Sequence, residues 1–437
     1  MKKLYIFACL ISFLGLMSDP ALAQRDQSLY LMPGVFQRIE TNPAFLSRNR
    51  INIVLPAPSF SLSHSGFVLS DVLVEKPGTD SLQLDMNGVL AKLKAQNFVR
   101  ARMQSELLGV GLRLGNLQLS LKASTRASFY GRYPRELIDL AWNGNAQFIG
   151  QTVNVQPDFE ALAYHELAVG GAYRLGKLQI GAQLKYLIGM AQIETFQSNL
   201  SLTTGAEYYQ LRADVDAGLR ASVFDLGSVD DLGFEYEADP LTGNQGFALD
   251  LGAVYQINDR LEVSASLLDL GSIKWTDQAR QYQAEGSIAF EGFDLQEVTA
   301  ADFDFGEWGD SVLNEIELTE SNLAYRTPLA RQVFVSATFR PIQSLRLSLL
   351  HHSEFYRGQH LKTLTLAASK DVGKWLTGGL SYGLRSQGHV LGANLSIKLG
   401  PFLWYAASDH ILAPLDVMNA RQFNLRFGMN LAIGKIK

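Results

Sequence analysis

Repeated pairs of short alternating segments, each pair joined by a tight turn, constrain the fold of this chain more than any other feature. In residues 166–190, two runs of about ten residues flank the turn Leu175–Lys177, and small or apolar residues alternate with polar ones. A period of two gives a strand one apolar and one polar face. Strands of this length, joined by tight turns on one side and longer loops on the other, predict a membrane-spanning antiparallel β-barrel. The pattern returns at 246–270, 332–350, 361–384 and 389–406.

The first 23 residues are typical of an export signal rather than of a folded segment. Lys2–Lys3 is a positive start, residues 4–17 are apolar, and Ala21–Ala23 is a small-x-small cleavage site. The apolar run is too short to span a membrane as a helix. We expect Sec export and a mature chain of 24–437 without thiols, because the single cysteine, Cys9, lies in the signal.

Composition separates this chain from the common alternatives. No run of eighteen apolar residues occurs after the signal, so no transmembrane helix is expected. Charged residues make up 19%, and there are 38 glycines, 16 tyrosines and 24 phenylalanines, which suits a barrel with aromatic girdles. The formal net charge of −5 argues against a nucleic-acid partner. A secreted β-sandwich would alternate similarly, but no Pro/Ser-rich linker divides the chain, which favours one large barrel.

The whole pattern predicts an all-β protein, a barrel of about fourteen strands with short helices in its loops. Between residues 200 and 290, the expected strands do not add up to the even number that a bacterial outer-membrane barrel has. A barrel of this width has an interior larger than side chains fill, so a plug or water must occupy it. Two segments are candidates for a plug: the irregular residues 24–50, and residues 85–102, where apolar residues have helical spacing.

An acidic loop is expected over residues 285–325, with eleven carboxylates and no Lys or Arg between Glu285 and Glu320. Its close-set acidic side chains are compatible with calcium binding, but their spacing matches no EF-hand loop, which favours a solvated surface or a partner-binding loop. The residues concerned are Asp302, Asp304, Glu307 and Asp310.

No catalytic constellation is recognisable, so we expect neither an enzyme nor a cofactor or metal. The chain has no GxSxG elbow, HExxH motif or phosphate-binding loop. His351 and His352 are neighbours on an expected strand and therefore face opposite sides, whereas His352 and Glu354 share a face.

Charged residues within the expected strands should avoid the lipid face. The arginines concerned are Arg113, Arg126, Arg174, Arg212, Arg220, Arg340, Arg346 and Arg426, and Asp214, Asp216 and Asp250 are possible lumen partners. Two interpretations stay open: a polar lining for a solute path, or an ion-pair network that stabilises a closed barrel.

Several motifs are spread over essentially the whole expected mature chain: 28–37 with Asn42–Phe45, then 133–138, 142–145, 150–153, 184–189, 200–204 and 246–275. Together they resemble an uncharacterised family of outer-membrane barrels of Bacteroidota. A pattern within 252–271 is similar to membrane proteins of type IX secretion and gliding, and Asn42–Pro43–Ala44 resembles the N-terminal hatch of FadL-type barrels.

The resemblance implies a protein of a Gram-negative outer membrane, surrounded by lipid. Its expected function is FadL-like passive transport of a small hydrophobic ligand, with a hatch at Asn42, Pro43, Ala44 and Phe45. The alternative is a non-transporting barrel that anchors a cell-envelope partner protein, through the acidic loop or a periplasmic surface.

Overall fold

The computed structural model describes residues 27–75, 81–207, 209–223, 243–290, 316–385, 388–413 and 416–436. Within them, a closed antiparallel barrel has fourteen strand positions, as the sequence predicts. The wall positions, in order, are β1 (Asn49–Val54) with β2 (Ala57–His64), β5 (Gln96–Leu114), β6 (Leu117–Pro134), β8 (Asp158–Leu175), β9 (Leu178–Thr204), β11 (Gln245–Gln256), β12 (Leu261–Trp275), β15 (Tyr325–Pro328) with β16 (Arg331–Ile342), β17 (Leu345–Tyr356), β18 (Gln359–Val372), β19 (Leu376–Arg385), β20 (Gly388–Leu399), β21 (Phe402–Ser408) and β22 (Gln422–Lys435).

The barrel closes where its last strand meets its first position. β22 pairs antiparallel with β1 from Asn49↔Lys435 and with β2 from Ser59↔Arg426. The first position is broken between β1 and β2 because Pro56 lacks the N–H that a central strand would need. On its other side this position pairs with β5, so the barrel wall has no free edge here.

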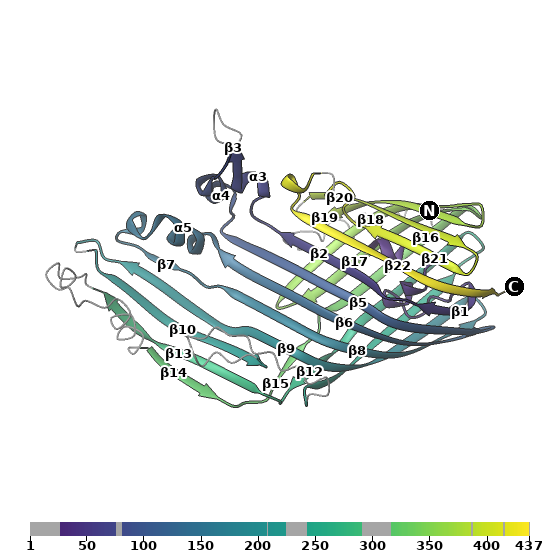
Figure 1. Cartoon of the computed structure of the whole chain (residues 1–437), viewed down its shortest axis with the longest axis horizontal. Helices are drawn as coiled ribbons and strands as arrows, with labels where there is room; N and C mark the ends of the chain where they lie inside the picture. The colour runs from purple at the N-terminus through teal and green to yellow at the C-terminus, as the bar shows by residue number, and fades with distance from the viewer. Residues whose placement is uncertain are drawn as a thin grey trace, which may run out of the picture.

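The two ends of the barrel differ (Figure 1). At one end, the short-turn end, tight turns such as Gly115–Asn116 and Gly176–Lys177 join the strands, and the described C-terminus lies there. The opposite, long-loop end carries α3 (Leu69–Val72), β3 (Leu73–Glu75), β4 (Leu82–Leu84), α4 (Met86–Lys92), α5 (Arg135–Asn143), η2 (Ala146–Phe148) and η3 (Val417–Asn419). None of the described helices is long and apolar enough to span a membrane.

A second piece of sheet, the extension sheet, continues from the long-loop end (Figure 1). Residues 178–188 of β9 pair with β11 inside the barrel wall, but residues 192–204 pair with β10 instead. β10 and β13 therefore lie outside the wall, which is why the strand count between 200 and 290 does not close from sequence. The extension sheet comprises the outer half of β9 with β7 (Thr152–Asn154), β10 (Leu211–Ser222), β13 (Ala279–Phe290) and β14 (Ile316–Ser321).

Two expectations about local structure are wrong. The segment 85–102 is helical only in α4, because the apolar 3–4 spacing ends at Leu93 and alternation begins in β5; α4 lies outside the barrel, so it is no plug (Figure 1). The expected loop 285–325 is strand at both its described ends, in β13 and in β14 with β15.

The barrel wall is polar inside and apolar outside, the reverse of a water-soluble protein. On β6, Lys122 is 2% exposed while its neighbour Leu121 is 57% exposed, and on β8 Glu166 is 1% exposed next to Leu167 at 45%. An exposed apolar band around a closed barrel fits a lipid environment and would be an aggregation hazard in water.

Candidate functional site: the barrel lumen

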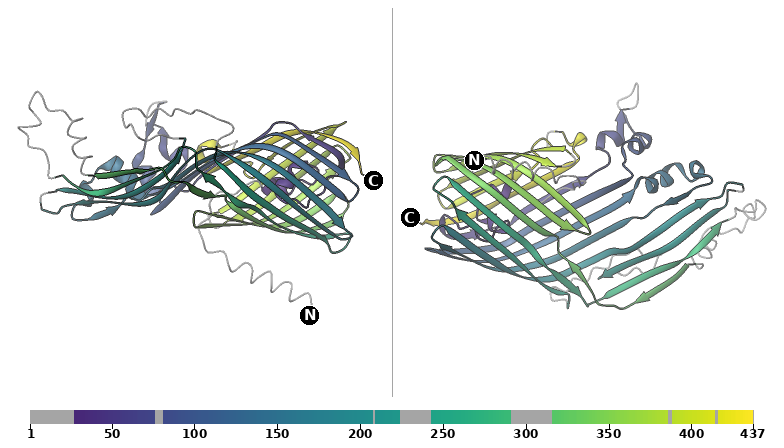
Figure 2. Two further views of the ribbon diagram at one scale, coloured as in Figure 1. Left: turned by 90° about the horizontal axis from the view of Figure 1, so that it is seen from below. Right: turned by 180° about the vertical axis from the view of Figure 1, so that it is seen from behind.

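Residues 27–48, here called the plug, lie inside the barrel and contact its wall on several sides (Figure 2). α2 (Gln27–Tyr30) and η1 (Phe36–Glu40) are short, and several of their side chains form hydrogen bonds to the wall. Ser28 Oγ donates to Asp409 over 2.6 Å, and Gln37 exchanges two hydrogen bonds of 2.7 Å with Asn430. The Tyr30 hydroxyl lies 2.6 Å from Ser264 Oγ.

The Asn42–Phe45 segment forms a tight turn against β9, β11 and β12. Asn42 Oδ1 accepts a 2.9 Å hydrogen bond from the Ala44 N–H, and Asn42 Nδ2 donates to the Ala265 carbonyl over 3.2 Å. Two glycines paired across β9 and β11, Gly181 and Gly252, leave the space that this turn fills. A Cβ at Gly252 would lie 2.1 Å from Asn42 Oδ1, and one at Gly181 would lie 2.4 Å from the Pro43 carbonyl carbon.

Aromatic side chains complete the seat of the plug. The Phe36 ring covers Gly111, whose Cβ would fall 2.2 Å from the ring. Phe45 packs edge-on against Tyr30 with 5.1 Å between ring centroids, and the Arg38 guanidinium lies 3.7 Å above the Phe45 ring. The plug is therefore held by shape as well as by hydrogen bonds.

Glu40 is the charged anchor of the plug. Its carboxylate lies 3.0 Å from Lys122 Nζ and 3.2 Å from Arg426 Nη1, and it accepts a 3.0 Å hydrogen bond from Gln104. All four side chains are buried. Three of them come from β6, β22 and β5, so one plug carboxylate ties three wall strands together.

A second cluster of charged side chains lies in the lumen and joins strands β6, β8, β9, β11 and β12. Lys185 Nζ lies 2.7 Å from Asp250 and 2.5 Å from Asp269, and Arg126 lies 3.0 Å from Glu166 and 3.3 Å from Asp269. The register of β11 with β12 shifts at this point, and Asp269 adopts a positive φ of 58°. The bulge turns both Leu268 and Asp269 into the lumen, which re-aims the carboxylate toward the two cations.

Glu354 forms a third cluster with two arginines of β5. Arg102 Nη1 donates to Glu354 over 2.9 Å, and Arg100 also donates to this carboxylate. His352 shares the inner face with Glu354, as alternation predicts, but stacks on Phe334 with centroids 4.1 Å apart. Among the described residues, no group of three His, Cys, Asp or Glu side chains is arranged to hold a metal ion.

At the long-loop mouth, one arginine joins the barrel to the base of the extension sheet. Arg357, in the β17–β18 turn, lies 2.5 Å from Asp158, 2.9 Å from Glu160 and 3.0 Å from Glu194. Burial lowers the pKa of Arg357, but the charge of Glu160 and the other carboxylates outweigh burial, so the pKa is raised. Arg357 therefore stays charged and fixes this rim.

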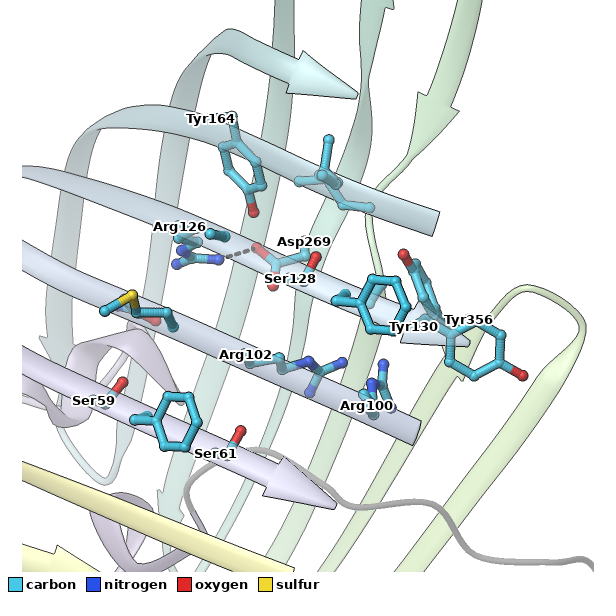
Figure 3. A pocket seen from close by; sticks show the side chains of 18 of the residues that line it. Ser59, Ser61, Arg100, Arg102, Arg126, Ser128, Tyr130, Tyr164, Asp269 and Tyr356 are labelled. Carbon is cyan, nitrogen blue, oxygen red and sulfur yellow. Dashed lines mark hydrogen bonds and ion pairs between the residues drawn. The ribbon is translucent and has the colours of Figure 1, made fainter. Parts of the chain in front are cut away.

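A cavity of about 80 Å³ lies between the second and third clusters (Figure 3). Its lining includes the charged groups of Arg100, Arg102, Arg126 and Asp269. Aromatic and aliphatic side chains lie among them: Tyr130, Leu162, Tyr164, Leu329 and Tyr356. The cavity is large enough for a few water molecules or a small ligand fragment with an apolar part.

The residues singled out from the sequence fall into separate places. Asn42, Pro43, Ala44 and Phe45 lie in the lumen, whereas Asp302, Asp304, Glu307 and Asp310, like the export signal, lie outside the described residues. The expected lumen pairs are partly wrong: Asp250 pairs with a lysine, and Asp214 pairs with Arg212 in the extension sheet, where Asp216 also lies.

The charged residues of the lumen that sequence reasoning missed include Glu40, Lys185 and Asp269. Lys185 has a recognisable signal, since it occupies an inward position of an alternating strand. Asp269 lies one residue out of phase because of the bulge, and Glu40 lies in an irregular segment, so neither has a periodicity that marks it.

Replacing Asn42 with alanine should loosen the plug locally. The change removes the side-chain acceptor of the Ala44 N–H and the donor to the Ala265 carbonyl, at about 1 kcal/mol for each hydrogen bond. We expect amide exchange in residues 42–46 to accelerate about tenfold or more, measured by hydrogen–deuterium exchange in nanodiscs. Asn419→Ala, in an exposed loop at the long-loop end, serves as the control and should leave that exchange unchanged.

Comparison with protein families finds a match to a family of unknown function, DUF5723, over residues 43–409. Comparison with curated proteins finds no significant match. The chain is similar to the solved structure of the Ralstonia pickettii toluene transporter TbuX, with 10% identity, coverage of 95% and 96% of the two chains and a TM-score of 0.43.

Two further similar structures are of TodX. The deltaS2S3 mutant of this monoaromatic hydrocarbon channel has 9% identity, coverage of 95% and 96% and a TM-score of 0.46. The Pseudomonas putida toluene transporter TodX has 8% identity, coverage of 90% and 91% and a TM-score of 0.39. At these identities and TM-scores, the similarities carry no argument about a ligand.

Proposed function

This chain belongs to the DUF5723 family, whose function is unknown, and we propose that it is an outer-membrane barrel that passes a small, largely hydrophobic molecule. The lumen is sealed by the N-terminal plug, which acts as the hatch. The observation that carries the proposal is the position of the plug. It separates the cavity near the long-loop end from a second hollow at the short-turn end, whose lining includes Arg38 and Phe45 of the plug itself.

The barrel wall supports a membrane location. Its outward side chains are leucines, valines and aromatics, and its inward side chains are charged or polar. A helical or sandwich protein in water would place these residues the other way round. Short turns at one end and long connections at the other correspond to the periplasmic and extracellular ends of outer-membrane barrels, so the plug would enter from the periplasmic side.

The contacts of the plug support a seal that is able to move. Its anchors are hydrogen bonds and ion pairs to side chains, such as Glu40 with Lys122, rather than a strand pairing with the wall. Water or a ligand is able to replace such contacts one at a time, whereas strand pairing would have to break as a unit. Displacing the Asn42–Phe45 turn from the space beside Gly181 and Gly252 would open a route along β9 and β11.

The cavity supports a ligand with an apolar body. Tyr130, Tyr164 and Tyr356 with Leu162 and Leu329 offer aromatic and aliphatic surface within the lumen. Each arginine of the lining has a carboxylate partner, which is Glu354 for Arg100 and Arg102, and Asp269 and Glu166 for Arg126. A small hydrophobic molecule therefore fits the chemistry of this cavity.

Filling the cavity should block passage. Ser128→Trp places an indole on the inner face of β6 at the cavity, and we expect uptake of radiolabelled naphthalene to fall at least fivefold. Uptake is measured in cells of a host with a lipopolysaccharide outer leaflet, which slows the unaided entry of such compounds. Ala123→Trp, on the outward face of the same strand, is the matched control. Both variants must show heat-modifiable migration, and equal uptake by wild type and Ser128→Trp would refute the proposal.

The alternative, a barrel that anchors a secretion or gliding partner, stays a prediction. The acidic residues on which it depends lie outside the described residues. No contact of the described residues favours it over passage through the lumen.

A further inference from the structure

The hollow at the short-turn end, here called the vestibule, has a volume of about 580 Å³ and is lined by seven arginines. Only two carboxylates, Asp259 and Glu262, line it with them, and it contains no lysine. The lining therefore carries five more cations than carboxylates, and Asp371, which lies behind it and pairs with two of the arginines, reduces the excess to four. The net charge of the whole chain is −5, so this concentration of cations does not follow from the overall composition.

Three of the arginines have carboxylate partners. Arg340 lies 2.9 Å from Glu262, and Arg346 lies 2.5 Å from Asp371. Arg48 reaches the same Asp371 at 3.7 Å, so two cations share one carboxylate. Among the described residues, no ion pair reaches the other four: Arg38, Arg113, Arg174 and Arg260.

Of these four arginines, Arg260 is exposed, whereas the other three are at least partly buried. Arg113 is only 8% exposed, and its guanidinium donates to the Gly115 carbonyl over 3.0 Å. Arg38 donates from Nε to the Tyr30 carbonyl over 2.8 Å and is stacked on Phe45. The Nε of Arg174 is buried without a hydrogen-bond partner. Backbone carbonyls and an aromatic ring orient the guanidinium groups of Arg38 and Arg113 but do not neutralise their charge.

We propose that the vestibule is a binding site for a small soluble oxyanion, a carboxylate or phosphate compound, held between the plug and the wall. Guanidinium groups bind such anions in a planar, two-point geometry that lysine does not offer. A concave surface of one charge with low-dielectric walls also concentrates the field and the counter-ion. The volume admits an organic anion with two or three acidic groups as well as inorganic phosphate.

The position of the vestibule indicates a soluble anion rather than a lipid headgroup. Arg113, Arg174 and Arg346 lie near strand ends on the lumen side, and their outward neighbours, such as Leu114 and Tyr173, occupy the lipid side. The wall therefore separates the guanidinium groups from the surrounding bilayer.

The site also joins two parts that must separate if the plug moves. Arg38 and Arg48 belong to the plug, whereas Arg113, Arg174, Arg260, Arg340 and Arg346 belong to the wall and its turns. An anion bound between them would reduce the repulsion between the two sets of cations. We expect it to stabilise the seated plug. This inference does not depend on the proposed passage of a hydrophobic molecule, because binding is measurable in a sealed barrel.

Calorimetric titration of the mature protein in zwitterionic nanodiscs with citrate and with inorganic phosphate tests the proposal. We expect saturable binding of citrate, weakened at least tenfold in the double variant Arg174→Gln/Arg260→Gln. Neither residue has an ion pair within the described chain, so the fold should persist. Arg212→Gln, in the extension sheet, is the matched control and should bind as the wild type does.

Hydrogen–deuterium exchange gives a second readout. Citrate should slow exchange of residues 33–48 in the wild type but not in the double variant. Absence of saturable binding, or equal binding by wild type and double variant, would overturn the proposal. If phosphatidylglycerol in the nanodisc abolishes citrate binding, a lipid headgroup occupies the vestibule and the soluble source is wrong.

Discussion

If the proposed plug seals the barrel, replacing Gly252 with leucine should make the barrel conduct ions. A Cβ at this position would lie 2.1 Å from Asn42 Oδ1 and 2.9 Å from Pro43 Cδ, distances that atoms do not tolerate. The plug is irregular and held by side-chain contacts, whereas β11 is paired on both sides. The turn should therefore yield before the strand does. In planar bilayers we expect discrete openings from Gly252→Leu and a silent wild-type protein.

Gly171→Leu is the matched control for this experiment. Gly171 faces outward on β8, where the nearest atom to a new Cβ is Leu119 Cδ2 at an ordinary 3.8 Å. It should remain silent. Gly181→Leu, which meets the same turn from β9, should conduct like Gly252→Leu. Silence of both inward variants, with heat-modifiable migration intact, would show that the Asn42–Phe45 turn does not seal the lumen.

Replacing Lys185 with methionine should cause the largest loss of stability. The side chain is 2% exposed, and it lies within 2.7 Å of both Asp250 and Asp269. Removing it leaves Arg126 alone with three buried carboxylates. Breaking a buried ion pair on one side costs about 3–5 kcal/mol, so the urea midpoint for unfolding from lipid vesicles should fall markedly.

A double variant separates charge from packing. In Lys185→Met/Asp250→Asn, one cation faces two carboxylates, so the net charge of the cluster returns to its native value. We expect at least half of the lost stability to be recovered. Lys177→Met, in the exposed β8–β9 turn, should change the midpoint little. If Lys185→Met costs less than about 1 kcal/mol, the cluster is hydrated rather than buried, because exposed pairs contribute only that much.

The alternation of apolar and polar residues was sufficient to predict the barrel architecture. One face of a barrel strand contacts lipid and the other faces the lumen, so the polarity of each residue indicates the face on which it lies. Leu119, Leu121 and Lys122 on β6 follow this rule. The rule does not separate strands of the wall from strands of the extension sheet such as β10 and β13, which is why the strand count between residues 200 and 290 does not close from sequence.

The candidate site was less predictable because its parts are far apart in sequence. The sequence marks Asn42 as part of a turn motif. The space that this turn fills, however, is left by Gly181 and Gly252, which are more than 130 residues away in the sequence. Arginines such as Arg113 and Arg346 were expected in the lumen, but their convergence with Arg38 into one vestibule depends on barrel closure. The bulge at Asp269 depends on the pairing of β11 with β12.

The sequence by itself determined the solvent of each face, the antiparallel order of the strands and their approximate number, because these follow from a local period of two. Only the tertiary structure decided where the plug sits, which charges meet and which strands leave the wall. Ion pairs such as Glu40 with Lys122 and Arg426 are made between segments that no local pattern relates. Their formation requires that the barrel close first and bring the three strands around the same carboxylate.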